Sequence, residues 1–280
     1  MSERVLTAKE IAAFELHLRE AEKSEFTISK YLHDCRKFLH YANGRETTKE
    51  LVIEYKQSLI DSGAYEVGSI NSMLTSVNVL LKFLGWTDCS VKCLKTQRKI
   101  YCAEEKELSK AEYERLLSAS KDQPRLQLIL KTICSTGIRV SELQYFTVEG
   151  VRSGEVTGEC KNKLRTVIIP KQLKHLLLNY ANTHMIESGI IFRTRSGKPI
   201  DRSNIWAAMK KLCAAARVNP EKVFPHNLRK LFARTFYKIE KDIAKLADIL
   251  GHSSINTTRI YLISSGREHR KKIDRLGLLG

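Results

Sequence analysis

Apolar residues in the first hundred positions recur at the three- and four-residue steps of amphipathic helices. The clearest stripe lies in residues 27–42 and comprises Ile28, Tyr31, Leu32, Cys35, Phe38 and Leu39. Asn43 and Gly44 follow it as a stop signal. Looser stripes occupy residues 7–20, 49–63 and 69–85. Four helices with short connections predict a small helical bundle.

The periodic pattern stops after residue 89, and residues 90–106 are polar and basic without a period. We interpret them as a linker between a helical domain at 1–89 and a second domain at 107–280. A helix is expected at 108–119, because Ser109 and Glu112 have the spacing of a capping box. A buried helix is expected at 126–134, ending before Gly137.

Residues 151–170 alternate between apolar and polar and contain two glycines, which predicts a short hairpin or a three-stranded sheet. Helical patterns resume at 171–181 and 203–216 and continue to about residue 262. The predicted fold class is therefore mainly α, with a small β-sheet in the C-terminal domain.

The charge of the chain is strongly positive and unevenly distributed. Its 48 Lys and Arg against 31 Asp and Glu give a net charge of +17. Residues 1–102 hold 15 basic and 13 acidic side chains, whereas residues 103–280 hold 33 and 18. A net charge of this size is typical of nucleic-acid-binding proteins. We expect the polyanion to lie mainly against the C-terminal domain, where released counterions would favour binding.

Cysteine usage indicates that the protein works in a reducing compartment, and the hydropathy of the chain predicts no membrane-spanning segment. The seven cysteines form no regular framework and no CxxC pair, so we expect free thiols and no zinc site. No apolar run approaches the roughly 20 residues that span a bilayer. The charged first twenty residues lack the apolar centre of a secretory signal. These features predict a cytosolic or nuclear protein.

Arg139 stands in the segment STGIRVSEL. Gly137 can end the preceding helix in a left-handed cap, which places Arg139 at the start of the next helix. An arginine there can hold a phosphate with both arms of its guanidinium while backbone amides assist. An ordinary surface arginine after a helix cap is the simpler interpretation of this segment alone.

His226 and Arg229 stand in the segment FPHNLRKLFARTFY. Pro225 suits the first position of a helix, and residues three apart lie on one helical face. Such a pair can hold one phosphate, the imidazole moving a proton and the guanidinium binding oxygens. Taken alone, however, a histidine and an arginine at this spacing are common.

His252 and Tyr261 stand in the segment DIAKLADILGHSSINTTRIYL. A helix is expected to end at Gly251, with His252 next and Tyr261 on a second short helix. A plain helix-turn-helix, with Tyr261 in its core, explains the same pattern. In the hairpin segment, the turn carries Lys161, Lys163 and Arg165, for which a solvated basic loop is the simplest interpretation.

Taken together, these segments closely resemble the tyrosine recombinase (lambda integrase) family, including Xer-like and phage integrases. TISKYLHDCRKFLHY resembles the family's core-binding domain, and IFRTRSGKPIDRSNIW resembles the stretch that precedes its HxxR helix. The resemblance thus covers essentially the whole chain. It implies that Glu142 is a supporting acid. The catalytic residues that it implies are Arg139, Lys161, His226, Arg229, His252 and Tyr261.

The hairpin departs from the family pattern. The family usually has GKGNKxR with its first lysine catalytic, whereas this chain has ECKNKLR, so that Cys160 stands at the lysine's place. Lys161 is one position further on, and a shift by one residue in a strand turns a side chain to the opposite face. A turn of altered length could restore Lys161, which we favour over Lys163.

The resemblance further implies a mechanism and a set of partners. Tyr261 would form a 3′-phosphotyrosine, with His226 as base, His252 on a phosphate oxygen and Lys161 protonating the 5′-oxygen. No metal or other cofactor is expected, in agreement with a sequence that has neither a GxxxxGK[ST] loop nor a clustered metal-ligand motif. The expected partners are double-stranded recombination sites, clamped between two domains. The chain would be a homotetramer on DNA and a monomer or weak oligomer alone.

Two alternatives remain at this point. A type IB topoisomerase shares the chemistry, but the four-helix domain and the short chain favour a recombinase. A helix-turn-helix regulator would explain the charge and residues 242–262, but not Arg139, the hairpin lysines or HNLR. Since no additional N-terminal arm-binding domain is evident, we expect a simple recombinase of the Xer type or a small mobile-element integrase. Integration, excision, inversion and dimer resolution all stay open as its task.

Overall fold

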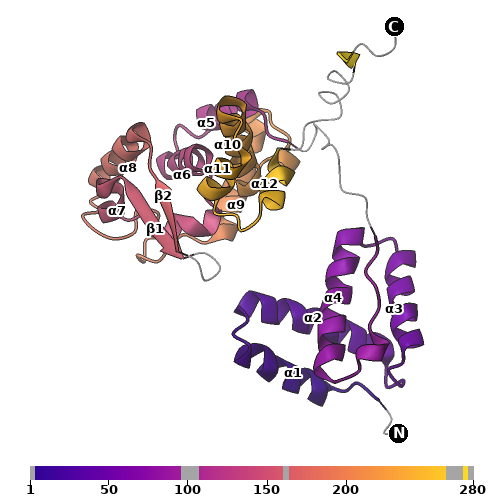
Figure 1. Ribbon diagram of the computed structural model, residues 1–280. Helices are drawn as coiled ribbons and strands as arrows, with labels where there is room; N and C mark the ends of the chain where they lie inside the picture. The colour runs from indigo at the N-terminus through magenta and orange to yellow at the C-terminus, as the bar shows by residue number, and fades with distance from the viewer. Residues whose placement is uncertain (1–3, 96–106, 160–163, 263–273, 277–280) are drawn as a thin grey trace. The chain divides into compact units, whose positions relative to one another are not determined.

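The computed structural model describes residues 4–95, 107–159, 164–262 and 274–276 (Figure 1). The chain divides into two compact units, residues 1–98 and 99–280, and each is described by itself. The described residues are mainly helical with one small sheet, which confirms the predicted fold class. The predicted linker 90–106 lies partly outside the described residues, and the predicted domain boundaries stay a prediction.

The first unit is a bundle of four helices, as the apolar pattern predicted. Side chains of Thr7, Ser24 and Thr48 cap three of the helices by accepting backbone amides. Asn43 ends the second helix in the left-handed region, with a φ of 46°. The helices are α1 (Ala8–Glu20), α2 (Glu25–Ala42), α3 (Lys49–Asp61) and α4 (Val67–Phe83), followed by the 3₁₀ helix η1 (Thr87–Cys89).

The second unit holds the segments that carry the candidate chemistry. Ser109 caps its first helix in a capping box with Glu112, as predicted. The elements are α5 (Lys110–Ala119), α6 (Pro124–Thr136), η3 (Val140–Tyr145), α7 (Val148–Ser153), β1 (Glu155–Glu159), β2 (Leu164–Ile168), α8 (Lys171–Thr183), α9 (Arg202–Ala216), η4 (Pro220–Lys222), α10 (Pro225–Glu240), α11 (Ile243–Leu250) and α12 (Ile255–Tyr261).

The sheet is an antiparallel hairpin of β1 and β2, in which Glu155 lies opposite Ile168 and Glu159 opposite Leu164. The predicted hairpin is therefore confirmed, but residues 151–153 belong to α7 rather than to a strand. Side chains of β2 alternate: Arg165 and Val167 are buried, while the even-numbered residues are exposed. The turn residues 160–163 lie outside the described residues.

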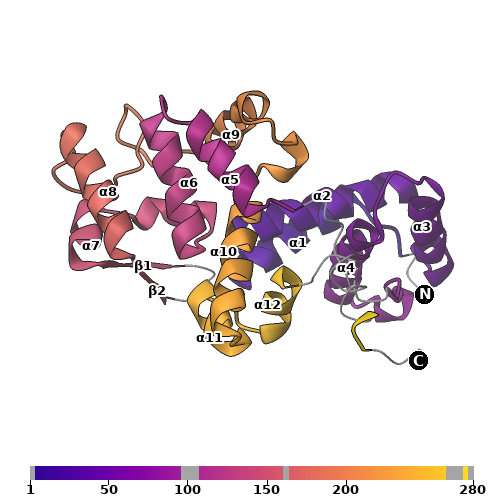
Figure 2. The same ribbon diagram turned by 90° about the horizontal axis from the view of Figure 1, so that it is seen from above.

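Two groups of elements in the second unit meet at α6 (Figure 2). One group consists of α7, α8 and the hairpin, which lie together in both views. The other consists of α10, α11 and α12, which pack on one another. Helix α6 contacts both α8 and α10, and Gly137 and Arg139 follow its C-terminal end. In the described ranges, no helix combines the length and the apolar character that crossing a bilayer requires.

Candidate active site

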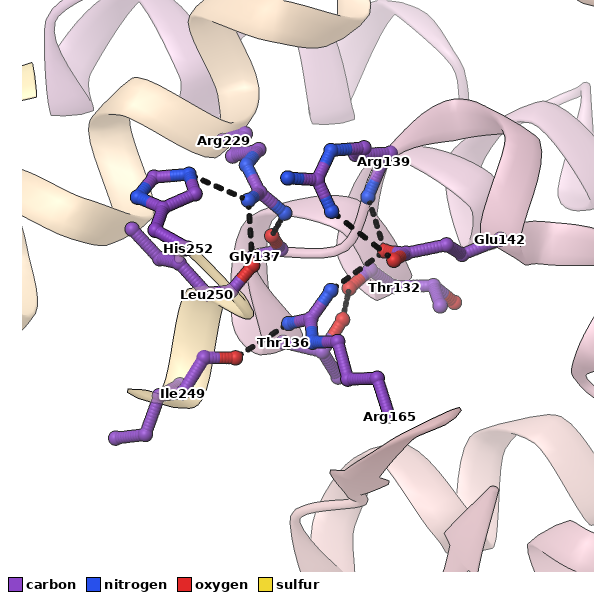
Figure 3. A network of polar contacts seen from close by, with 10 residues as sticks. All are labelled: Thr132, Thr136, Gly137, Arg139, Glu142, Arg165, Arg229, Ile249, Leu250 and His252. Carbon is purple, nitrogen blue, oxygen red and sulfur yellow. Dashed lines mark hydrogen bonds and ion pairs between the residues drawn. The ribbon is translucent and has the colours of Figure 1, made fainter. Parts of the chain in front are cut away.

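Arg139 occupies the position that the helix-end pattern predicted. Gly137 ends α6 in the left-handed region, with a φ of 64°, and Arg139 is the residue before η3. The buried Glu142 carboxylate accepts the Arg139 backbone amide at 2.6 Å and its guanidinium at 3.3 Å (Figure 3). The Arg139 side chain keeps 29% of its surface exposed. Glu142 therefore orients an arginine that solvent can still reach.

Arg229 is the largest fully buried side chain of the unit, with 1% of its surface exposed. Pro225 starts α10, so that His226 and Arg229 lie one turn apart on the same face. The Arg229 guanidinium donates to the carbonyls of Gly137 and Leu250, the latter at 2.7 Å (Figure 3). The Leu250 carbonyl belongs to the C-terminal turn of α11, where the helix dipole favours a cation.

His252 lies directly after the left-handed Gly251 that ends α11. Its Nε2 is 3.0 Å from a guanidinium nitrogen of Arg229, and its Nδ1 is 2.8 Å from the hydroxyl of the buried Thr258. Because a guanidinium can only donate, Nε2 must be the acceptor. The single proton of a neutral His252 ring therefore sits on Nδ1 and is donated to Thr258.

Tyr261, the last residue of α12, packs against these groups. Its ring centroid is 5.0 Å from that of His226 and 5.2 Å from that of His252, and the Arg229 guanidinium carbon lies 5.9 Å from it. Only 7% of Tyr261 is exposed. The structure thus places three predicted site residues, His226, Arg229 and His252, against the ring of a fourth, Tyr261. Arg139 lies beside Arg229 (Figure 3).

The concentration of positive charge perturbs the titratable groups. Desolvation, with the charges of Lys230, Arg229 and Arg139, lowers the pKa of His226 to about 4, although the residue as a whole is exposed. Desolvation and the nearby arginines also lower the pKa of His252 to about 4. Burial, followed by the charge of Arg139, lowers the pKa of Arg229 to about 10. At neutral pH both imidazoles are therefore neutral while Arg229 keeps its charge.

Arg165 belongs to this cluster, although the sequence favoured a solvated basic loop for it. It projects inward from β2, and its guanidinium donates to Glu142 at 2.6 Å and to the carbonyl of Ile249 (Figure 3). Gly251 lies against it so closely that a Cβ there would be 2.6 Å from the Arg165 Cδ. The sequence signal that could have found it is its spacing of two residues from the apolar Val167, which puts both side chains on one face of the strand.

The remaining predicted site residue, Lys161, lies outside the described residues, as does its alternative Lys163. Among the residues that the structure describes, His, Cys, Asp and Glu side chains form no cluster of three suited to a metal ion.

Comparison with known proteins assigns the family. Residues 106–267 match the model of the phage integrase family. A protein called tyrosine recombinase XerA, from Pyrococcus furiosus, is 28% identical and aligns with 100% of this chain and 98% of its own length. A tyrosine recombinase XerD from Xanthomonas axonopodis is 33% identical over 60% of this chain and 61% of its own length.

Solved structures share the fold. A lambda integrase dimer bound to a COC′ core site matches with a TM-score of 0.75 at 17% identity, covering 95% of this chain and 80% of that one. XerH recombinase bound to its difH substrate matches with a TM-score of 0.70 at 18% identity, covering 96% and 84%. Since the family model matches more than half of the sequence, the chain belongs to the phage integrase family of tyrosine recombinases, enzymes that break and rejoin DNA strands through a tyrosine.

Proposed function

We propose that this chain recombines DNA at specific sites by attack of the Tyr261 hydroxyl on a phosphodiester. The observation that carries the proposal is the convergence of Tyr261 with His226, His252 and Arg229, three side chains suited to activating a phenol and holding a phosphate. Attack would form the bond from the tyrosine oxygen to phosphorus and release the 5′-oxygen, leaving a 3′-phosphotyrosine. A 5′-hydroxyl of a partner duplex would then displace the tyrosine and join the new strand.

Arg139 and Arg229 would neutralise the charge that grows on the nonbridging oxygens. Each guanidinium is held by a fixed acceptor, Glu142 for Arg139 and two carbonyls for Arg229, so little reorganisation is needed during the reaction. Replacing either with lysine keeps the charge but loses the planar fork. The rate of cleavage should therefore fall far more than the affinity for DNA.

His226 would accept the Tyr261 proton. A free tyrosine has a pKa of about 10, so the phenol needs a nearby acceptor and a positive field. With its pKa lowered to about 4, His226 is neutral at pH 7 and can accept a proton. A bound phosphate would bring a negative charge that offsets the surrounding cations and raises the basicity of this ring.

The described residues enclose the Arg229 side chain and shield it from solvent. The residue is 1% exposed, and the Tyr261 ring lies over its guanidinium. A phosphate could therefore reach Arg229 only after the Tyr261 side chain moves. We infer that DNA binding shifts α12, which is a short helix of seven residues at the end of the described catalytic segment.

Lys161 would protonate the departing 5′-oxygen, with Lys163 as the alternative. An alkoxide leaves poorly without an acid, whereas a thiolate needs little protonation. A substrate with sulfur at the bridging 5′-position should therefore restore cleavage to Lys161→Ala and to no other site variant. Restoration in Lys163→Ala instead would assign the acid to that residue, and restoration in neither would exclude both.

The excess of positive charge in residues 103–280, which carry 33 basic and 18 acidic side chains, supports double-stranded DNA as the partner. One structural relative is a lambda integrase tetramer bound to a Holliday junction. By analogy we propose that this chain acts as a homotetramer on DNA and is a monomer or weak oligomer alone. We further propose that it works in the cytoplasm, on the nucleoid.

A nicked suicide substrate tests the proposed function. Genomic DNA bound by the Tyr261→Phe protein supplies the duplex, and a nick beside the cleavage point lets the short fragment diffuse away, which traps the adduct. The wild-type chain should form a covalent protein–DNA complex without added metal or nucleotide. No adduct would indicate a DNA-binding regulator, and relaxation of supercoiled DNA that lacks the site would indicate a topoisomerase.

A further inference from the structure

Arg165 links two segments that carry catalytic candidates but lie far apart in the sequence. Through Glu142 it is connected to η3, which begins next to Arg139, and through the Ile249 carbonyl it is connected to the end of α11, just before His252 (Figure 3). One side chain therefore contacts the supports of two candidate groups, Arg139 and His252.

Protein groups engage both terminal nitrogens of Arg165. The residue is 9% exposed, and its two terminal nitrogens donate to a buried carboxylate and to a backbone carbonyl. Glu142 in turn holds both Arg139 and Arg165, with side-chain exposures of 6% for the acid and 8% for Arg165. A buried carboxylate shared by two guanidiniums is strongly directional, because each bond is charge-assisted.

Two neighbouring carbonyls at the end of α11 receive arginines from different elements. Ile249 accepts Arg165 from β2, and Leu250 accepts Arg229 from α10. The negative end of the α11 dipole favours both cations. Gly251 then closes the turn against the Arg165 side chain, where a Cβ would be only 2.6 Å from Cδ. Because this turn leads directly into His252, a shift of Arg165 would move the histidine.

We infer that Arg165 is a positioning residue, which holds Arg139, through Glu142, and the His252 turn at the separation that phosphate transfer requires. It touches neither DNA nor the reacting atoms. The inference rests on the proposed function, since it assigns Arg165 a role in the same reaction. Small displacements of catalytic groups are costly: an error of about 1 Å can lower a rate on the order of 100-fold.

The test compares Arg165→Gln and Arg165→Lys with Arg152→Gln, which removes one positive charge from an exposed site in the same unit. The cleavage rate at saturating protein is measured on the nicked substrate, and DNA affinity is measured separately. Arg165→Gln should cleave on the order of 100-fold more slowly with nearly unchanged affinity. Arg165→Lys should recover part of this loss by keeping the ion pair with Glu142, and Arg152→Gln should cleave normally.

Two further readouts separate positioning from general loss of structure. Desolvation is the main cause of the lowered pKa of His252, and the charges of the nearby arginines, Arg165 among them, lower it further. Arg165→Gln should therefore raise that pKa in an NMR titration, and Arg165→Lys should raise it less. If Arg165 acts through Glu142, adding Arg165→Gln to Glu142→Gln should cost far less than it costs the wild type. Urea unfolding of each variant identifies samples that are simply unfolded.

The outcomes separate the role of Arg165 from the proposed function. A wild-type chain that forms no adduct refutes the proposed function, whatever Arg165 does. A cleaving wild type with an equally active Arg165→Gln overturns the role of Arg165 alone. Parallel losses in binding and cleavage, or fully additive losses in the double variant, would also overturn it, since they indicate a DNA contact or an independent effect.

Discussion

Thr258→Val removes the hydroxyl that orients His252 and changes little else. Thr258 is fully buried, and its hydroxyl lies 2.8 Å from Nδ1 of the His252 ring. Valine has nearly the same shape but cannot accept a hydrogen bond. Because Nε2 accepts from Arg229, the proton of the neutral ring is on Nδ1. In Thr258→Val this Nδ1–H would lose its acceptor.

The size of the effect follows from the cost of an unsatisfied donor. Leaving a buried donor without a partner costs about 1–3 kcal/mol. To donate to a phosphate oxygen, His252 must also carry a proton on Nε2, which the negative charge of the phosphate favours. If the cost of the unpaired Nδ1–H is borne in that transition-state form and not in the DNA-bound ground state, cleavage should slow by about 5- to 150-fold. Because Thr258 faces inward, DNA affinity should change much less.

Thr257→Val is the matched control, since Thr257 is the exposed neighbour on the same short helix. Both variants would be compared in single-turnover cleavage of the nicked substrate, and the tautomer of His252 would be read from long-range proton–nitrogen NMR spectra at pH 7. We expect the proton on Nδ1 in the wild type and in Thr257→Val. Equal cleavage by the two variants, or a proton on Nε2 of the neutral wild-type ring, would refute the reasoning.

Two other predictions follow from the same cluster. The pKa values of His226 and His252, about 4, lie below the unfolded value of about 6.5, so the unfolded chain gains protons first as pH falls. The contribution of these histidines to the free energy of unfolding should be constant above pH 6.5 and should decrease as the pH falls from there toward 4. Urea unfolding at pH 7 and 5.5 checks this, and equal free energies of unfolding at the two pH values would contradict it. Gly251→Ala should lower the free energy of unfolding more than Gly189→Ala does. Both glycines have left-handed φ values, 64° and 73°, so the backbone strain is similar, but only the Cβ added at Gly251 would collide with Arg165. Equal losses would contradict the close contact.

Local signals predicted most of the described site. A left-handed glycine before Arg139, a proline before His226 and a glycine before His252 are helix-end features that depend on a few neighbouring residues. Such features can be recognised without knowing the fold, and the order of the segments along the chain then indicated the family. The helix–turn–helix around Gly251 lies where the sequence placed it.

Arg165 could not be assigned in the same way, because its partners are distant in sequence. Glu142 is 23 residues away and Ile249 is 84 residues away, so its burial depends on how β2 packs against η3 and α11. Viewed locally, an arginine after two lysines is a basic turn. The start of the hairpin was also misplaced, because the helix before it, α7, has only six residues, too few for a helical period to show.

The identity of the nucleophile is the central claim, and mass spectrometry of the trapped adduct tests it most directly. The covalent complex from the nicked substrate would be digested with nuclease and protease, and the peptide that retains nucleotide would be sequenced. We expect a phosphotyrosyl linkage at Tyr261 and no adduct from the Tyr261→Phe protein, which should still bind DNA. An adduct on another residue, such as Tyr237, or one that persists in Tyr261→Phe, would contradict it.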